Sequence, residues 1–232
     1  MGEATNLSAE DAATSLARFM NIMGTGQKDV GKLGAAVVGL GNNFATTEAE
    51  IVEMSLRIAG AGRQAGMSEG EVLGFATALS SVGIDAEAGG TAISQVMKRM
   101  GNAVADGGDS ISEYARIAGM SAQDFAAAWG DDSAGTMARF IAGLQGAQAN
   151  GENVNATLSD LGITGIRETD ALLRLSPAND VLVSSLKMGN DEYARGTALA
   201  EEAAKRYETA ESRIRMAGNA LKDAGIEIGA TF

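Results

Sequence analysis

Apolar residues recur along this chain at the three- and four-residue spacing of an α-helix, and glycine separates one run from the next. In the clearest run, Val72, Phe75, Ala76 and Leu79 occupy positions i, i+3, i+4 and i+7, which predicts a helix with one buried face. Comparable runs cover residues 12–23, 51–58, 93–104, 125–129 and 137–144. The pattern predicts an all-α fold: a multi-helix array of short Gly-punctuated helices with a longer amphipathic helix at the C-terminal end.

The residues that separate these runs also follow a repeated pattern. Gly66-Met67-Ser68 closes one run and opens the next, with Glu71 following. A left-handed Gly ends a helix, the next apolar residue packs against that helix, and Ser68 with Glu71 forms a capping box for the new one. The same order recurs at Gly119-Met120-Ser121 and, in partial form, at Gly83-Ile84-Asp85 and Gly162-Ile163-Thr164. Further caps are predicted at Asn6-Leu7-Ser8 with Asp11, at Thr47 with Glu50, and at Ser110 with Glu113. These signals indicate stacked helices rather than a catalytic site.

Three regions follow from these patterns. Residues 1–145 are predicted to form a helical core, 146–190 connecting helices and loops, and 191–232 an amphipathic helix of coiled-coil type. Residues 30–40 are ambiguous between helix and strand, and their helical neighbours favour a loose helix. Residues 146–155 have the composition of a solvated connection.

The C-terminal helix has an apolar seam at spacings of three and four residues. The seam consists of Leu199, Ala203, Tyr207, Ala210, Ile214, Ala217 and Leu221. Such a seam suits docking on the chain's own domain, on another helix, or on another copy of the chain. The sequence leaves these alternatives open.

Glycine is abundant, histidine and cysteine are absent, and Pro177 is the single proline. Each of the 31 Gly costs about 0.5–1 kcal/mol relative to Ala when it lies inside a helix. The glycines therefore predict either marginal, adaptable helices or many turns and close helix crossings. Without Cys and His, disulfides, zinc sites of the usual Cys/His kind and nucleophile–histidine catalysis are all excluded.

The chain is acidic, with a formal net charge of −12. Between residues 102 and 170, ten acidic residues face three basic ones, Arg116, Arg139 and Arg167. This balance disfavours nucleic-acid binding through a basic surface. The first twenty residues lack the apolar run of a signal peptide. The longest apolar stretch, residues 33–40, is far shorter than the roughly 20 residues that span a bilayer, so we expect a soluble chain.

Two glycine-rich motifs imitate nucleotide sites. Residues 26–33 match the phosphate loop G-x-x-x-x-G-K, but Leu33 stands where a Ser or Thr must bind magnesium, and Asp29 would repel phosphate. Residues 60–66 carry one residue too many for the dinucleotide-binding glycine pattern. We therefore predict no cofactor and no cofactor-binding residue.

Acidic pairs are equally weak evidence for chemistry. Glu48 with Glu50 and Asp131 with Asp132 are typical of solvated faces and helix N-termini, and the sequence alone cannot place two carboxylates in a cleft. Trp129 lies on an apolar stripe, which predicts a core position. We predict no catalytic residue, no metal ligand and no enzymatic activity.

Several segments resemble the conserved core of phage tail tape measure proteins. They are residues 41–48 (GNNFATTE), 58–62 (IAGAG) with Gly66-Met67-Ser68, 78–84 (ALSSVGI) and 88–92 (AGGTA), and residues 6–23 are similar too. Residues 5–100 carry most of this resemblance, and 101–232 fit it as a helical continuation. Residues 1–145 are therefore interpreted as a helical tape-measure core.

The resemblance implies a structural component of a phage or prophage tail. Such proteins are long and mostly helical, lie in the lumen of the growing tail tube, set tail length during assembly, and leave the tube at DNA ejection. The implied partners are the tail tube protein, tail assembly chaperones and tail tip or baseplate proteins, with self-association through the C-terminal helix and no specific nucleic acid. The implied locations are the virion tail and, during assembly, the host cytoplasm.

Members of this family are commonly much longer than this chain. We therefore expect a fragment whose last helix continues in a longer parent chain. Two alternative functions stay open. One is a membrane-interacting helical protein that aids genome delivery, with transient membrane contact at ejection. The other is a muralytic enzyme domain, since some family members carry one, although no segment here matches such a domain.

Overall fold

A computed structural model describes residues 9–205 and 208–209 of the chain, and in this part it contains helices and no strand. The all-α prediction is confirmed. The helices are α1 (Ala9–Met23), η1 (Gln27–Asp29), α2 (Val30–Asn43), α3 (Glu48–Gln64), α4 (Glu69–Ser81), α5 (Ala86–Asp106), α6 (Gly108–Ile117), α7 (Ala122–Asp131), α8 (Ser133–Ala149), α9 (Val154–Asp160), α10 (Ile166–Leu175) and α11 (Asn179–Arg195). Residues 198–205 are also helical.

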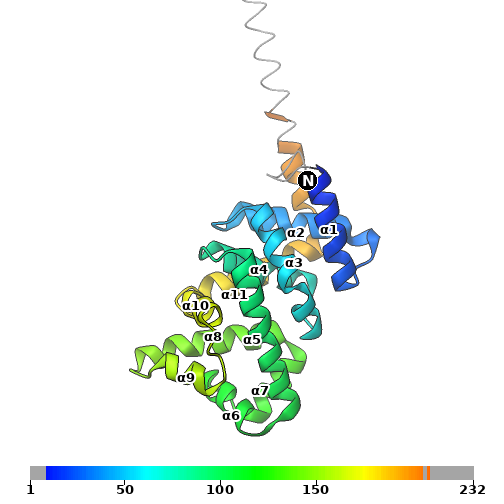
Figure 1. Cartoon of the computed structure of the whole chain (residues 1–232). Coiled ribbons are helices and arrows are strands. Elements are labelled where there is room, and N and C mark those ends of the chain that lie inside the picture. Colours follow the sequence, from blue (N-terminus) through cyan, green and yellow to red (C-terminus); the bar gives the residue numbers. More distant parts are fainter. Residues whose placement is uncertain (1–8, 206–207, 210–232) are drawn as a thin grey trace, which may run out of the picture.

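The helices form an elongated body, with α1–α4 and α11 toward one end and α6, α7 and α9 toward the other (Figure 1). The long helix α5 runs between the two ends and packs against α3, α6 and α10. Helix α4 lies between α2, α3 and α11. One continuous apolar core joins these contacts, and Phe75 of α4 and Phe140 of α8 are fully buried within it.

Helix α2 resolves the ambiguity over residues 30–40. These residues are helical, as favoured, but they are not loosely held, because every residue from 33 to 40 is buried. Helices α3, α4 and α11 pack around α2, so this stretch has no solvent-facing side on which polar residues would be expected. A stretch that is buried throughout shows no alternation of apolar and polar positions, which explains why residues 33–40 resemble a buried strand.

Three predicted boundaries differ in the structure. Ser110 and Glu113 do not cap a helix, because α6 already begins at Gly108, directly after a left-handed Gly107 that ends α5. The connection predicted over 146–155 is shorter, since α8 continues to Ala149 and α9 begins at Val154.

The helix predicted from residue 191 also begins differently. Helix α11 runs through this position to Arg195 and ends at Gly196, which has a φ of +69°. A new helix then starts at residue 198 and leaves the body at the end that holds α1 and α2 (Figure 1). Tyr207 and the seam residues from Ala210 onward lie outside the described residues, as does the predicted cap at Asn6-Leu7-Ser8.

Candidate functional site

The junction between α3 and α4 has the geometry that its sequence predicts. Gly66 has a φ of +86°, and its N–H donates to the carbonyl oxygen of Arg63 at 3.1 Å. The Met67 N–H donates to the carbonyl oxygen of Gly62 at 2.9 Å, which completes a Schellman motif. The Met67 side chain is 4% exposed and packs back on Gly62. The last carbonyl groups of α3 are thus satisfied where the chain turns.

Helix α4 begins with a complete capping box. The Ser68 Oγ accepts from the Glu71 N–H at 3.1 Å, and the Glu71 carboxylate accepts from the Ser68 N–H at 2.8 Å. Thr47 and Glu50 form the same reciprocal pair at the start of α3. Hydrogen bonds from Thr47 hold the pKa of the Glu50 carboxyl below its usual value. Both boxes confirm the predictions for these residues.

The same two hydrogen bonds recur at the three other Gly–apolar junctions of the sequence pattern, and also at Gly151, where the polar Glu152 follows. At the three junctions the left-handed residues are Gly83, Gly119 and Gly162, and the following N–H groups of Ile84, Met120 and Ile163 donate to Leu79, Ala115 and Leu158 at 3.2, 2.8 and 2.8 Å. Of these apolar residues, Ile84 and Ile163 are buried and Met120 is half-buried. The repeated sequence pattern therefore corresponds to one repeated turn.

Helix α11 reaches the Ser68 capping box from far along the chain. The Ser68 hydroxyl donates to the Asn190 side-chain oxygen at 2.8 Å, and the Asn190 amide donates to Glu71 at 3.3 Å. One turn further, the buried Ser185 hydroxyl donates to the carbonyl oxygen of Gly74 at 2.9 Å. Sequence reasoning missed this contact. The available signal was a pair of small residues four apart on each helix, Gly70 with Gly74 and Ser185 with Gly189.

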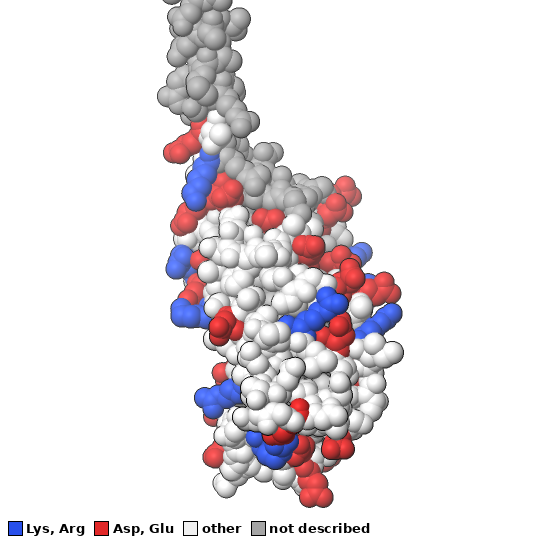
Figure 2. Space-filling view, turned by 90° about the vertical axis from the view of Figure 1, so that its left-hand side faces the viewer, with Lys and Arg blue, Asp and Glu red and all other residues white. Residues whose placement is uncertain are grey.

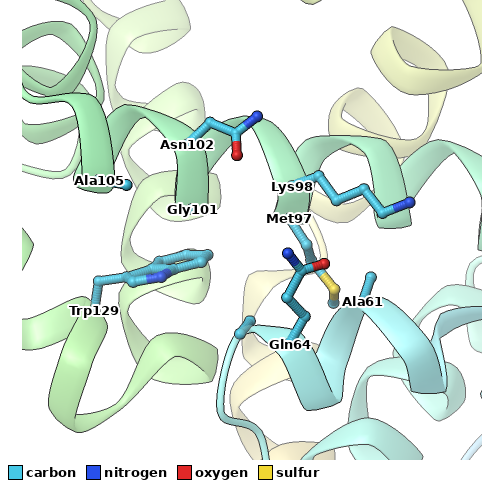
Figure 3. A pocket seen from close by; sticks show the side chains of 9 residues that line it. Ala61, Gln64, Met97, Lys98, Gly101, Asn102, Ala105 and Trp129 are labelled. Atoms are coloured by element: carbon cyan, nitrogen blue, oxygen red, sulfur yellow. The ribbon is translucent and has the colours of Figure 1, made fainter.

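A pocket of about 220 Å³ lies between the end of α3, the C-terminal half of α5 and α7 (Figure 3). Trp129 lies beneath Gly101 and is 7% exposed, so its predicted core position is confirmed. The polar lining residues are Gln64, Lys98 and Asn102. Because Lys98 is the one titratable group of this lining, the pocket does not supply the acid and base that general acid–base catalysis requires.

The acidic pairs and the phosphate-loop imitation have structural roles. Asp132 accepts from the Gly135 N–H at 2.7 Å and so caps α8. Lys32 pairs with Asp29 at 3.0 Å, and the 3₁₀ turn over residues 27–29 leads directly into α2. This segment follows a helix rather than a strand, so it does not have the context of a phosphate loop.

Charges of both signs are interleaved over the face shown in Figure 2. Arg116 contacts Glu113 at 2.8 Å and Glu152 at 3.3 Å, and its guanidinium lowers the pKa of the Glu113 carboxyl.

Burial raises the pKa of the Tyr114 hydroxyl to about 12. Tyr114 packs on Phe125 and Phe140, with ring centroids 6.3 and 5.2 Å away. This aromatic group joins α6 to α7 and α8.

Within the described residues, no group of three or more Asp or Glu is arranged to hold a metal ion. In the same part of the chain, no helix combines the length and the apolar character needed to cross a bilayer.

These features define an all-α protein whose repeated element is a glycine-closed helix junction. The sequence profile described as phage-related minor tail protein matches residues 1–162, and the chain belongs to this family. Members of the family are tape measure proteins, tail components that are generally structural rather than enzymatic. No curated protein and no solved structure matches the chain.

Proposed function

We propose that this chain is a tape measure segment that sets tail length during assembly and leaves the tail tube at DNA ejection. The family match over residues 1–162 carries this proposal. The described helices support it, because a helix laid along a tube adds about 1.5 Å for each residue. A chain of this kind converts a number of residues into a distance without any catalytic group.

The proposed partners follow from this role. They are the tail tube protein around the segment, tail assembly chaperones before it enters the tube, and tip or baseplate proteins at the end of the tube. The net charge of −12 suits a protein that shares a channel with DNA, because like charges do not attract. Filter binding at low salt checks this point: tight retention of DNA would contradict it.

The experiment is a length series in the phage that encodes the protein. Insertions of about 40, 80 and 120 helix-forming residues after Gly196 are expected to lengthen the tail by about 60, 120 and 180 Å. Gly196 is a suitable site because α11 ends there and the packed body is left intact. Electron microscopy of negatively stained virions measures the tail.

Insertion of the same nucleotides outside the gene is the matched control, because it changes genome length and leaves the protein unaltered. Tails of unchanged length in all three insertion variants would refute the proposal. A labelled copy of the chain located by electron microscopy outside the tail would refute the proposed location.

A further inference from the structure

Helix α11 lies beyond the family-matched residues and seats in a groove between α2 and α4. Glycines line this groove. A Cβ at Gly74 would lie 2.7 Å from the Cα of Leu186, and a Cβ at Gly70 would lie 2.7 Å from the carbonyl oxygen of Gly189. On α2, a Cβ at Gly39 would lie 2.6 Å from the Glu192 side chain. The backbones of α4 and α11 are therefore in direct contact, with no side chains between them.

Two residues of α11 form hydrogen bonds along this groove. The Ser185 hydroxyl bonds the Gly74 carbonyl at one turn of α11, and Asn190 bonds both members of the Ser68–Glu71 capping box further along. Asn190 therefore contacts the two side chains that start α4. Docking of α11 and capping of α4 share the same groups.

The docked state also leaves polar atoms unsatisfied. Ser176 Oγ, Asn179 Oδ1 and Glu192 Oε2 are buried without a hydrogen-bond partner, and they lie on α11 or at its entry. A buried polar atom without a partner costs free energy that it regains when water reaches it. Two of these atoms, Asn179 Oδ1 and Glu192 Oε2, belong to α11, and undocking of this helix would return them to water, which lowers the free-energy cost of undocking.

The chain leaves α11 through a left-handed glycine. Gly196 ends the helix, and residues 198–205 lead away from the body (Figure 1). A pull on this exit acts first on the last turn of α11, where Glu192 lies on Gly39. The contacts at Asn190 and then at Ser185 follow in order, so the helix would peel off one turn at a time rather than slide as a whole.

We propose that α11 is a releasable latch, which undocks from the α2/α4 groove while α5 stays folded. Its release removes Asn190 from the capping box and loosens the start of α4 at the 66–68 junction. A pull beyond Gly196 is thereby converted into opening of the α3–α4 turn. This inference concerns the isolated chain and does not depend on the tail-length role.

Hydrogen exchange of the full chain, read by mass spectrometry, tests the latch. Amides of α11 are expected to exchange at least about 100-fold more readily than those of α5, because release is a local opening and α5 opens with the whole body. Asn190→Ala is expected to raise exchange about fivefold or more in α11 and in the first turn of α4, with α5 unchanged. The matched control is Asp191→Ala, whose side chain pairs with Lys187 on the same helix. It is expected to leave the first turn of α4 unchanged.

A disulfide provides the second arm, since the chain has no cysteine of its own. In a Gly39→Cys, Glu192→Cys variant the sulfur atoms fall within reach of the 2.05 Å bond, because residue 39 Cβ and residue 192 Cγ would be 2.6 Å apart. The oxidised form is expected to slow α11 exchange at least about tenfold relative to the reduced form of the same protein, without slowing α5. Exchange of α11 in step with α5, or no difference between oxidised and reduced protein, would overturn the proposal. Either result would leave the tail-length series unaffected.

Discussion

Substitution of Gly74 by Ala tests the central packing contact of this molecule. Gly74 lies in the middle of α4, where a Cβ would approach the Leu186 Cα and the Ser185 carbonyl oxygen at 2.7 Å each. These are backbone atoms, which cannot rotate away as a side chain can. Helix α11 would have to move outward to admit one methyl group.

The expected magnitude follows from three opposing effects. Overpacking a well-filled contact costs about 1–3 kcal/mol. Outward movement of α11 also stretches the buried Ser185–Gly74 hydrogen bond, which contributes about 0.5–1.5 kcal/mol. Ala is the better helix former and returns about 0.5–1 kcal/mol. We therefore expect Gly74→Ala to lower the free energy of unfolding by about 1–3 kcal/mol.

Urea unfolding followed by circular dichroism measures this change, and Gly60→Ala is its matched control. Gly60 lies inside α3 with open space around its Cα, so the same methyl group is expected to stabilise the protein by about 0.5–1 kcal/mol. Opposite signs for the two variants would support the packing argument. A Gly74→Ala protein as stable as Gly60→Ala would refute it.

Three further predictions concern the junctions and the aromatic group. Gly66→Ala is expected to cost about 1 kcal/mol because φ at this residue is +86°, and thermal unfolding should show a smaller loss for Gly66→Asn. Ser68→Ala removes the acceptor for the Glu71 N–H and is expected to cost about 1 kcal/mol, whereas Ser68→Thr keeps a hydroxyl that can both accept and donate and should retain most of the stability; an equal loss in both would contradict a capping role. Tyr114→Phe is expected to be neutral or stabilising at pH 7, because the buried hydroxyl has no partner. The wild-type protein should lose stability as pH rises from 10 to about 12, because the unfolded chain releases the Tyr114 proton at a lower pH than the folded protein does. Urea unfolding over this pH range should show a shallower loss of stability for Tyr114→Phe. Part of the loss is expected to persist in this variant, because the pKa of Tyr193 is also raised to about 12.

Sequence patterns predicted the structure correctly where the interacting groups are close together in the sequence. The Ser68–Glu71 box and the Gly66 turn involve groups within a few residues of one another, so their sequence pattern specifies the hydrogen bonds directly. The same reasoning failed at Ser110, where Gly107 ends α5 and α6 begins three residues earlier than the cap pattern implies. Ser110 therefore lies inside the first turn of α6.

The family could be identified from the sequence because its motif contains glycines that the fold requires. Gly89 and Gly90 of the AGGTA segment face Ile84 and Arg57 too closely to admit a Cβ. The position of α11 could not be predicted from the sequence. Ser68 and Asn190 are 122 residues apart, and neither side chain is unusual in its own helix.

The amino-acid sequence by itself determined the all-α class, the Gly–apolar junctions at Gly66, Gly83, Gly119 and Gly162, and the family, since each depends on spacing and conformation over a few residues. The tertiary structure alone decided how these helices close into one body. It set α11 on Gly70 and Gly74, buried residues 33–40 of α2, and joined α11 to the Ser68 capping box. The physical reason is that a glycine leaves room for a neighbouring backbone but does not specify which helix will fill it.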